Sequence, residues 1–180
     1  MDSKCLILPH SDYFSICREV CYTLHNSSIR SKEVSMRIMF VCHGNICRSP
    51  MGEYILKKML SDEGIEGVEV FSRGVSSEEE GNDIYPPAKR VLREHDVPFS
   101  SHSAHRISDS DFASADLVLA LDESNLRALN RRFPLSDKIR MLLDEEVDDP
   151  WYTGDFEGVY REISQGCRNI VKDLKNNIIR

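Results

Sequence analysis

The sequence lacks a long hydrophobic run and an excess of positive charge. Its 180 residues carry 23 Lys and Arg against 30 Asp and Glu, which gives a formal net charge of -7. No apolar stretch approaches the roughly 18 residues that a membrane-spanning helix needs. The CLILP segment after Lys4 is also shorter than the apolar part of a secretory signal, about 7 to 15 residues. We therefore expect a cytoplasmic protein without a nucleic-acid or membrane partner.

The cysteines of this sequence are not spaced like those of a disulfide framework or a metal site. The six cysteines lie at positions 5, 17, 21, 42, 47 and 167, with none between Cys47 and Cys167. This uneven placement is not typical of a disulfide framework. Cys42 and Cys47 lack the CxxC spacing of a zinc knuckle, and no second Cys or His cluster occurs at a ligand-like interval. We expect no metal and no other cofactor.

The first 35 residues differ from the rest of the chain. Their acidic and basic residues balance, so the whole negative charge belongs to residues 36–180. They show no sustained periodicity, whereas Met36 opens the first clear apolar strand. We interpret 1–35 as an N-terminal extension of unknown role and 36–180 as the domain proper. The alternative is that an amphipathic helix at 17–24 packs on the domain.

From Met36 onward, apolar runs alternate with helical patterns. Strands are indicated at 38–42, 68–71, 117–121 and 139–143, and helices at 49–60, 86–94, 122–132 and 156–174. Short apolar strands separated by helices predict a parallel sheet covered on both faces, a three-layer α/β sandwich. Ligands of such sheets bind at the carboxyl ends of the strands.

The stretch FVCHGNICRSPMGEY stands at such an end. Cys42 closes the first strand, and Ser49 followed by Pro50 has the form of a helix N-cap with proline at the first helical position. Between strand and helix, the loop amides and the positive end of the helix can form a cradle for a dianion such as phosphate. Gly44 permits a tight turn, and Arg48 offers a planar fork for two phosphate oxygens.

The same field favours the thiolate of Cys42, which makes this residue a candidate nucleophile. Attack of sulfur on phosphorus gives a cysteinyl-phosphate, with Arg48 and the loop amides holding the equatorial oxygens. We expect Asn45 to hold the loop in a left-handed conformation and Ser49 to donate a hydrogen bond to the thiolate. Cys47 has two interpretations: it packs under the loop, or it forms a reversible disulfide that protects Cys42.

These residues resemble the phosphate-binding loop of the low-molecular-weight protein tyrosine phosphatases, whose pattern is Cys, five residues, Arg, Ser. The segments SRG, SHSAHRISDSDF, LALDESNLRALNR and DDPWY come after it in that family's order and spacing, so the resemblance covers 36–180. It implies a central four-stranded parallel sheet, the flavodoxin-like phosphotyrosine phosphatase I fold, and a cytoplasmic enzyme without metal. Phosphotyrosine proteins or small aryl phosphates would be its partners, and we expect a monomer.

The resemblance also implies a general acid and base at Asp149, because the family's acid directly precedes a proline. The proline favours a turn or extended conformation at 149, and the reaction needs an acid to protonate the leaving oxygen. Asp148 and the glutamates at 145 and 146 remain alternatives. The substrate and phosphate site would then comprise His43, Gly44, Asn45, Ile46, Cys47, Ser49, Trp151 and Tyr152.

Three further residues are expected to support the loop. Asp122 would cap a helix or bind the loop, Ser72 would brace it, and His102 would bind the loop asparagine, with His105 as the competing histidine. Two residues depart from the family pattern. His43 adds a titratable group at the pocket rim, and Arg73 stands where a small residue is usual, which weakens the assignment of Ser72.

The same loop occurs in other functional branches. A protein arginine phosphatase is the first alternative, but that branch usually carries threonine at the position of Ile46 and lacks the paired aromatics that Trp151 and Tyr152 supply. An arsenate reductase would need further cysteines downstream of Cys47. The third alternative is a phosphate-binding module that has lost catalysis, yet the three catalytic candidates are all present.

Overall fold

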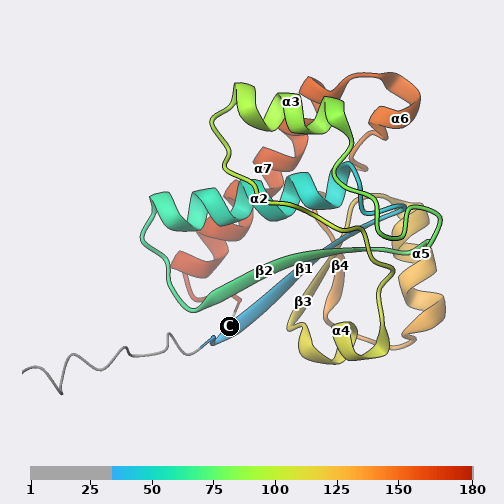
Figure 1. The fold of residues 1–180 in the computed structure, drawn as a ribbon. Helices are drawn as coiled ribbons and strands as arrows, with labels where there is room; N and C mark the ends of the chain where they lie inside the picture. Colours follow the sequence, from blue (N-terminus) through green and yellow to red (C-terminus); the bar gives the residue numbers. More distant parts are fainter. Residues whose placement is uncertain (1–33, 180) are drawn as a thin grey trace, which may run out of the picture. The chain divides into compact units, whose positions relative to one another are not determined.

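The computed structural model describes residues 34–179, and the fold there is built on one sheet (Figure 1). Its strands are β1 (Met36–Cys42), β2 (Val68–Gly74), β3 (Leu117–Ala120) and β4 (Ile139–Met141). They pair in the order β2-β1-β3-β4, and every pair is parallel. The predicted four-stranded parallel sheet is therefore confirmed. The helix considered for residues 17–24 lies outside the described residues.

Helices cover both faces of the sheet, as predicted (Figure 1). On one face lie α2 (Arg48–Asp62), α3 (Pro86–Glu94) and α7 (Phe156–Lys175). On the other face lie α4 (Asp109–Ser114) and α5 (Glu123–Arg132), while the short α6 (Pro150–Thr153) precedes α7. In residues 34–179, no helix is long and apolar enough to cross a membrane.

Strand β1 divides its side chains between two cores. Ile38 and Phe40 pack with α2, α3 and α7, whereas Met39 and Val41 pack with α5, because successive residues of a strand point to opposite faces. All four are fully buried, and each contributes on the order of 1.5–3 kcal/mol of burial energy. Gly52 of α2 lies so close to the Phe40 ring that a β-carbon there would be 2.4 Å from it. The strand that ends in Cys42 is thus firmly fixed.

The prediction from the sequence was wrong about the start of α2. The helix begins at Arg48, and Cys47 is the N-cap without a side-chain hydrogen bond, so Ser49 and Pro50 already lie inside the first turn. Two short helices were not predicted. Helix α4 begins with a capping box in which Ser108 and Asp111 exchange hydrogen bonds, and α6 begins at Pro150. Both are too short to show a hydrophobic period.

Candidate active site

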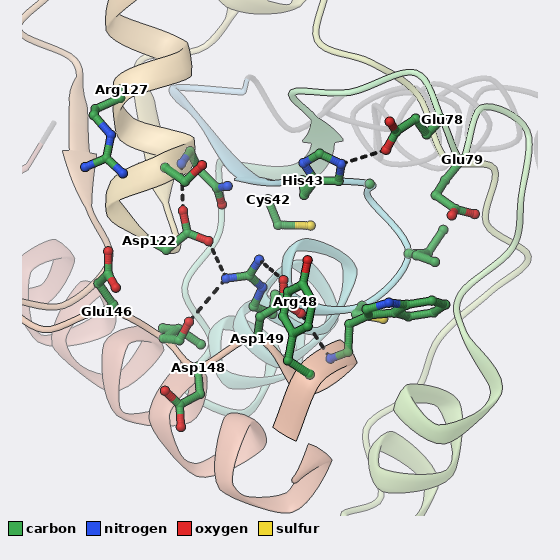
Figure 2. Close-up of a pocket in the computed structure, with 18 residues that line it drawn as sticks. Cys42, His43, Arg48, Glu78, Glu79, Asp122, Arg127, Glu146, Asp148 and Asp149 are labelled. Atoms are coloured by element: carbon green, nitrogen blue, oxygen red, sulfur yellow. Dashed lines mark hydrogen bonds and ion pairs between the residues drawn. The ribbon is translucent and has the colours of Figure 1, made fainter. Parts of the chain in front are cut away.

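Cys42 lies at the floor of a cavity at the carboxyl end of the sheet. The cavity has a volume of about 580 Å³, and its lining includes both Cys42 and Arg48 (Figure 2). Cys42 is only 3% exposed, and its Sγ is 3.0 Å from Ser49 Oγ at the start of α2. Asn45, in the loop between them, has φ of 61°, the left-handed conformation expected of it.

Asn45 is the centre of the hydrogen bonds that hold this loop. Its side chain is fully buried, and Nδ2 donates to Ser49 Oγ at 3.0 Å and to Ser72 Oγ at 2.9 Å. Its Oδ1 accepts from the His105 backbone N–H at 3.0 Å. His102 Nε2 donates to the Asn45 carbonyl at 2.7 Å, which is the histidine contact predicted from the sequence.

Ser72 continues this network to a residue that was not predicted. The Ser72 hydroxyl donates to Glu53 Oε2 at 2.6 Å, and Glu53 is 8% exposed although it carries a carboxylate. Lys57, one turn later on α2, donates to the other oxygen of Glu53 at 2.5 Å. The only sequence signal was the spacing of Glu53 and Lys57, which is equally typical of an exposed helix pair.

Arg73 is accommodated beside Ser72 on β2. Its guanidinium donates to the Ser72 carbonyl at 2.8 Å through Nη1 and to Asp111 at 2.8 Å through Nη2. The charge lies 5.3 Å from the Phe71 ring centre. Burial raises the pKa of Asp111, but the hydrogen bonds from Arg73 and Ser108, together with the Arg73 charge, outweigh it and leave the pKa lowered. The Arg73 side chain thus joins β2 to α4 and leaves the Ser72 hydroxyl to the loop network.

The Ser49 hydroxyl has one proton and two possible acceptors. It accepts from Asn45, and it can donate either to the Arg73 carbonyl at 3.2 Å or to Cys42 Sγ at 3.0 Å. A charged sulfur is the stronger acceptor, so a thiolate at Cys42 draws this proton. The hydroxyl is therefore placed to stabilise negative charge on the sulfur.

Arg48 is buried, and one terminal nitrogen of its guanidinium is held by two acceptors. Nη1 donates to Asp122 Oδ2 at 2.5 Å and to the Val147 carbonyl at 3.2 Å, while the Asp122 side chain also caps α5. Asp122 thus does both things that the sequence left open. Burial lowers the pKa of Arg48, but the charges of Cys42, Asp149 and Asp122 outweigh it and raise the pKa, so the guanidinium stays charged.

Asp149 lines the same cavity as Cys42, and its carboxylate binds the second terminal nitrogen of the Arg48 guanidinium. Its Oδ2 accepts from Arg48 Nη2 at 2.7 Å, and its Oδ1 accepts from the Trp151 backbone N–H at 3.1 Å. Asp148 also lines the cavity but makes no side-chain contact with Arg48 among the described residues. Of the acids considered at 145–149, only Asp149 pairs with the arginine of the loop in this part of the structure.

The rim combines aromatic and acidic side chains. Trp151 and Tyr152 line the cavity and are 59% and 85% exposed, and Trp151 packs at 5.5 Å on Tyr85. Ile46 and Gly44 also line it, and Gly44 has no positive φ, so Asn45 alone supplies the left-handed turn. The acidic rim consists of Glu78, Glu79, Glu146 and Asp148. The last two were considered from the sequence as alternative acids, whereas Glu78 and Glu79 were not predicted.

Cys47 faces the same cavity but differs from Cys42 in its surroundings. Burial, followed by the negative charges of Cys42 and Asp149, raises the pKa of Cys47 to about 12. Cys47 is therefore a protonated thiol at neutral pH. Of the described cysteines, Cys42, Cys47 and Cys167 are all free, and residues 34–179 contain no group of three or more acidic, Cys or His side chains placed to hold a metal.

A cysteine at the end of a central parallel strand, with an arginine six residues later at a helix start, defines the class of cysteine-dependent phosphatases. The chain belongs to the low molecular weight phosphotyrosine protein phosphatase family, whose model matches residues 37–179.

Relatives in sequence and structure agree with this membership. The chain is 35% identical over 141 residues to the low molecular weight protein-tyrosine-phosphatase PtpA of Staphylococcus haemolyticus, covering 74% of this chain and 90% of that protein. YfkJ from Bacillus subtilis superimposes with a TM-score of 0.76 at 32% identity, over 79% and 96% of the two chains. SP-PTP from Streptococcus pyogenes, a low molecular weight protein tyrosine phosphatase, gives 0.72 at 31%, over 77% and 93%.

Proposed function

We propose that the protein is a phosphatase that hydrolyses phosphotyrosine and small aryl phosphates through Cys42, Arg48 and Asp149. The observation that carries this proposal is the meeting of these three side chains in one cavity, where Arg48 binds Asp149 at 2.7 Å (Figure 2). Arg48 Nε makes no hydrogen bond to the described residues, and Nη2 is held only by Asp149 among them. This edge can take two phosphate oxygens once the dianion displaces the carboxylate.

The reaction has two steps. Cys42 Sγ forms a bond to phosphorus while the bond to the phenolic oxygen breaks, and protonated Asp149 gives its proton to that oxygen. Water then attacks the cysteinyl-phosphate, Asp149 accepts a proton from the water, and the sulfur leaves as thiolate. The Ser49 hydroxyl, 3.0 Å from Cys42 Sγ, stabilises that charge.

The depth of the cavity supports an aromatic substrate. Cys42 is 3% exposed at the floor, whereas Tyr152 at the rim is 85% exposed. A phosphate at the end of a tyrosine ring reaches such a floor more readily than one on the short side chain of serine. Ile46 cannot hydrogen-bond a guanidinium, which argues against phosphoarginine.

Three further proposals concern the domain boundary, the oligomeric state and the compartment of this enzyme. We infer that residues 36–180 form the catalytic domain, that it acts as a monomer and that the protein is cytoplasmic. The free cysteines at 42, 47 and 167 favour a reducing compartment.

Hydrolysis of matched peptides carrying phosphotyrosine, phosphoserine, phosphothreonine or phosphoarginine tests the proposal. We expect kcat/KM to be highest for phosphotyrosine, and a phosphate adduct on Cys42 to be found by mass spectrometry after acid quench. Cys42→Ser should lose turnover and keep phosphate binding. A preference for phosphoarginine would identify the protein as an arginine phosphatase instead. Turnover by Cys42→Ser would refute the covalent mechanism.

A further inference from the structure

A second cavity opens beside the active site and differs from it in charge. Its volume is about 590 Å³, and it adjoins the catalytic cavity at His43 and Ser124, which line both. Its walls come from residues 75–77 after β2, from Arg106 and Ile107, and from α5. Within the described residues, this lining contains Arg106, Arg131 and Arg132 and no acidic side chain.

Two of these arginines are available to a ligand. The side chains of Arg106 and Arg131 are exposed and make no hydrogen bond or ion pair with the described part of the chain. Arg132 is partly neutralised, because it binds Asp109 at 2.9 Å and the Ile107 carbonyl. The carboxylate of Glu80 contacts the backbone of Arg106 and not its guanidinium, because it accepts from the Arg106 backbone N–H and pairs with the His105 ring.

The positive groove is unusual in this molecule. The chain has a net charge of -7, and the catalytic cavity itself is lined by Glu78, Glu79, Glu146 and Asp148. Figure 2 shows Glu146 and Asp148 on one side of Arg48 and Glu78 and Glu79 on the other. A polypeptide that leaves the catalytic cavity past His43 and Ser124 passes Glu78, which pairs with His43 at 2.8 Å, and then enters a basic groove that has no acidic residue in its described lining.

We propose that the groove of Arg106, Arg131 and Arg132 binds acidic side chains that flank the phosphotyrosine of the substrate. The inference rests on the proposed function and deepens it, because it assigns a substrate preference to the neighbouring surface. The side chains of Arg106 and Arg131 are exposed, so each contributes modestly and mainly to encounter and binding. Only one flank of the peptide can occupy the groove, and the preference is therefore one-sided.

The experiment compares phosphotyrosine peptides with aspartates only before the phosphotyrosine, only after it, or with alanine on both sides. We expect one of the acidic peptides to exceed the alanine peptide by about threefold to tenfold in kcat/KM, mostly through KM. The double variant Arg106→Gln, Arg131→Gln should lose this advantage and hydrolyse a small aryl phosphate like the unmodified enzyme. Arg90→Gln on α3 is the matched control, because Arg90 lines neither cavity.

Binding separates this inference from the proposed function. Calorimetry of the same peptides with Cys42→Ser, with and without the two arginine changes, measures the preference without turnover. We expect the one-sided preference to persist in Cys42→Ser and to disappear when the arginines are replaced. Equal effects of both acidic flanks, or a preference that survives the double variant, would overturn the groove assignment even if the enzyme is active. Loss of aryl phosphate hydrolysis by the unmodified enzyme would refute the proposed function instead.

Discussion

Arg48 Nη2 lies 2.7 Å from Asp149 Oδ2, so the proposed phosphate ligand and the proposed acid are paired with each other. A phosphate dianion that binds Arg48 through the same nitrogen must displace this carboxylate. The contact therefore makes Asp149 and the phosphate competitors for Arg48.

Asp149→Asn tests this relationship in two ways. Hydrolysis of alkyl or poorly leaving aryl phosphates should fall by about 10²–10⁴ in kcat, because these need the proton in the transition state. An activated aryl phosphate should lose far less. Inorganic phosphate should inhibit the variant at lower concentration, since no carboxylate competes for Arg48. Steady-state kinetics with phosphate as inhibitor measures both effects. Equal losses of kcat on all substrates would show that another residue is the general acid.

The loop network gives a second prediction. Asn45→Ala removes the amide that holds Ser49 and Ser72 and leaves alanine at a φ of 61°. We expect about 1–3 kcal/mol of lost stability and a fall of roughly 10- to 100-fold in kcat/KM, because the reacting groups are misplaced.

Glu53→Gln tests the far end of the same network. It keeps the shape of the side chain but weakens the acceptor of the Ser72 hydroxyl, so a smaller loss in the same direction is expected. Asn130→Ala on the exposed face of α5 is the control. Thermal unfolding and kinetics of the three variants decide the matter, and an unchanged kcat/KM for Asn45→Ala would remove the loop from a positioning role.

Much of this site was accessible from the sequence because its parts are local. Cys42, Asn45 and Arg48 lie on one loop, and the apolar run before them predicted the strand. The amphipathic stripe of α7 was also correctly predicted. Glu53 was not, since an acid on a helix normally faces water, and its burial depends on Ser72, which a distant strand supplies. The basic groove was missed for the same reason, because the fold brings Arg106 and Arg131 together from separate segments.

Shortening the chain tests the domain boundary. A chain that begins at Met36 should fold and keep most of its kcat/KM, because β1 begins there. It loses the Ser35 hydrogen bonds to the Gly67 carbonyl, so it should be less stable than a chain that begins at Val34, by about 1 kcal/mol. Circular dichroism melts and kinetics of both chains provide the comparison. Aggregation or inactivity of both would indicate that residues 1–33 pack on the domain.

Oxidation should inactivate the enzyme reversibly if Cys47 protects Cys42. Mild peroxide would convert Cys42 to the sulfenic acid, the Cys47 sulfur would attack it with loss of water, and a dithiol would restore both thiols. In Cys47→Ser, recovery by dithiol should become poorer. Cys167→Ser is the matched control, because Cys167 is fully buried away from the cavity. Full recovery of Cys47→Ser would exclude the protective pairing.

The rate of this disulfide closure should depend on pH, because the pKa of Cys47 is raised to about 12. The attacking species is the thiolate, so its fraction, and with it the closure rate, should rise about tenfold per pH unit between roughly pH 7 and 9. Oxidation of Cys42 removes one of the charges that raise this pKa, but burial, the larger cause, remains. Mass spectrometry after timed quenching measures the closure, and a rate independent of pH would show that the Cys47 thiolate is not the group that attacks.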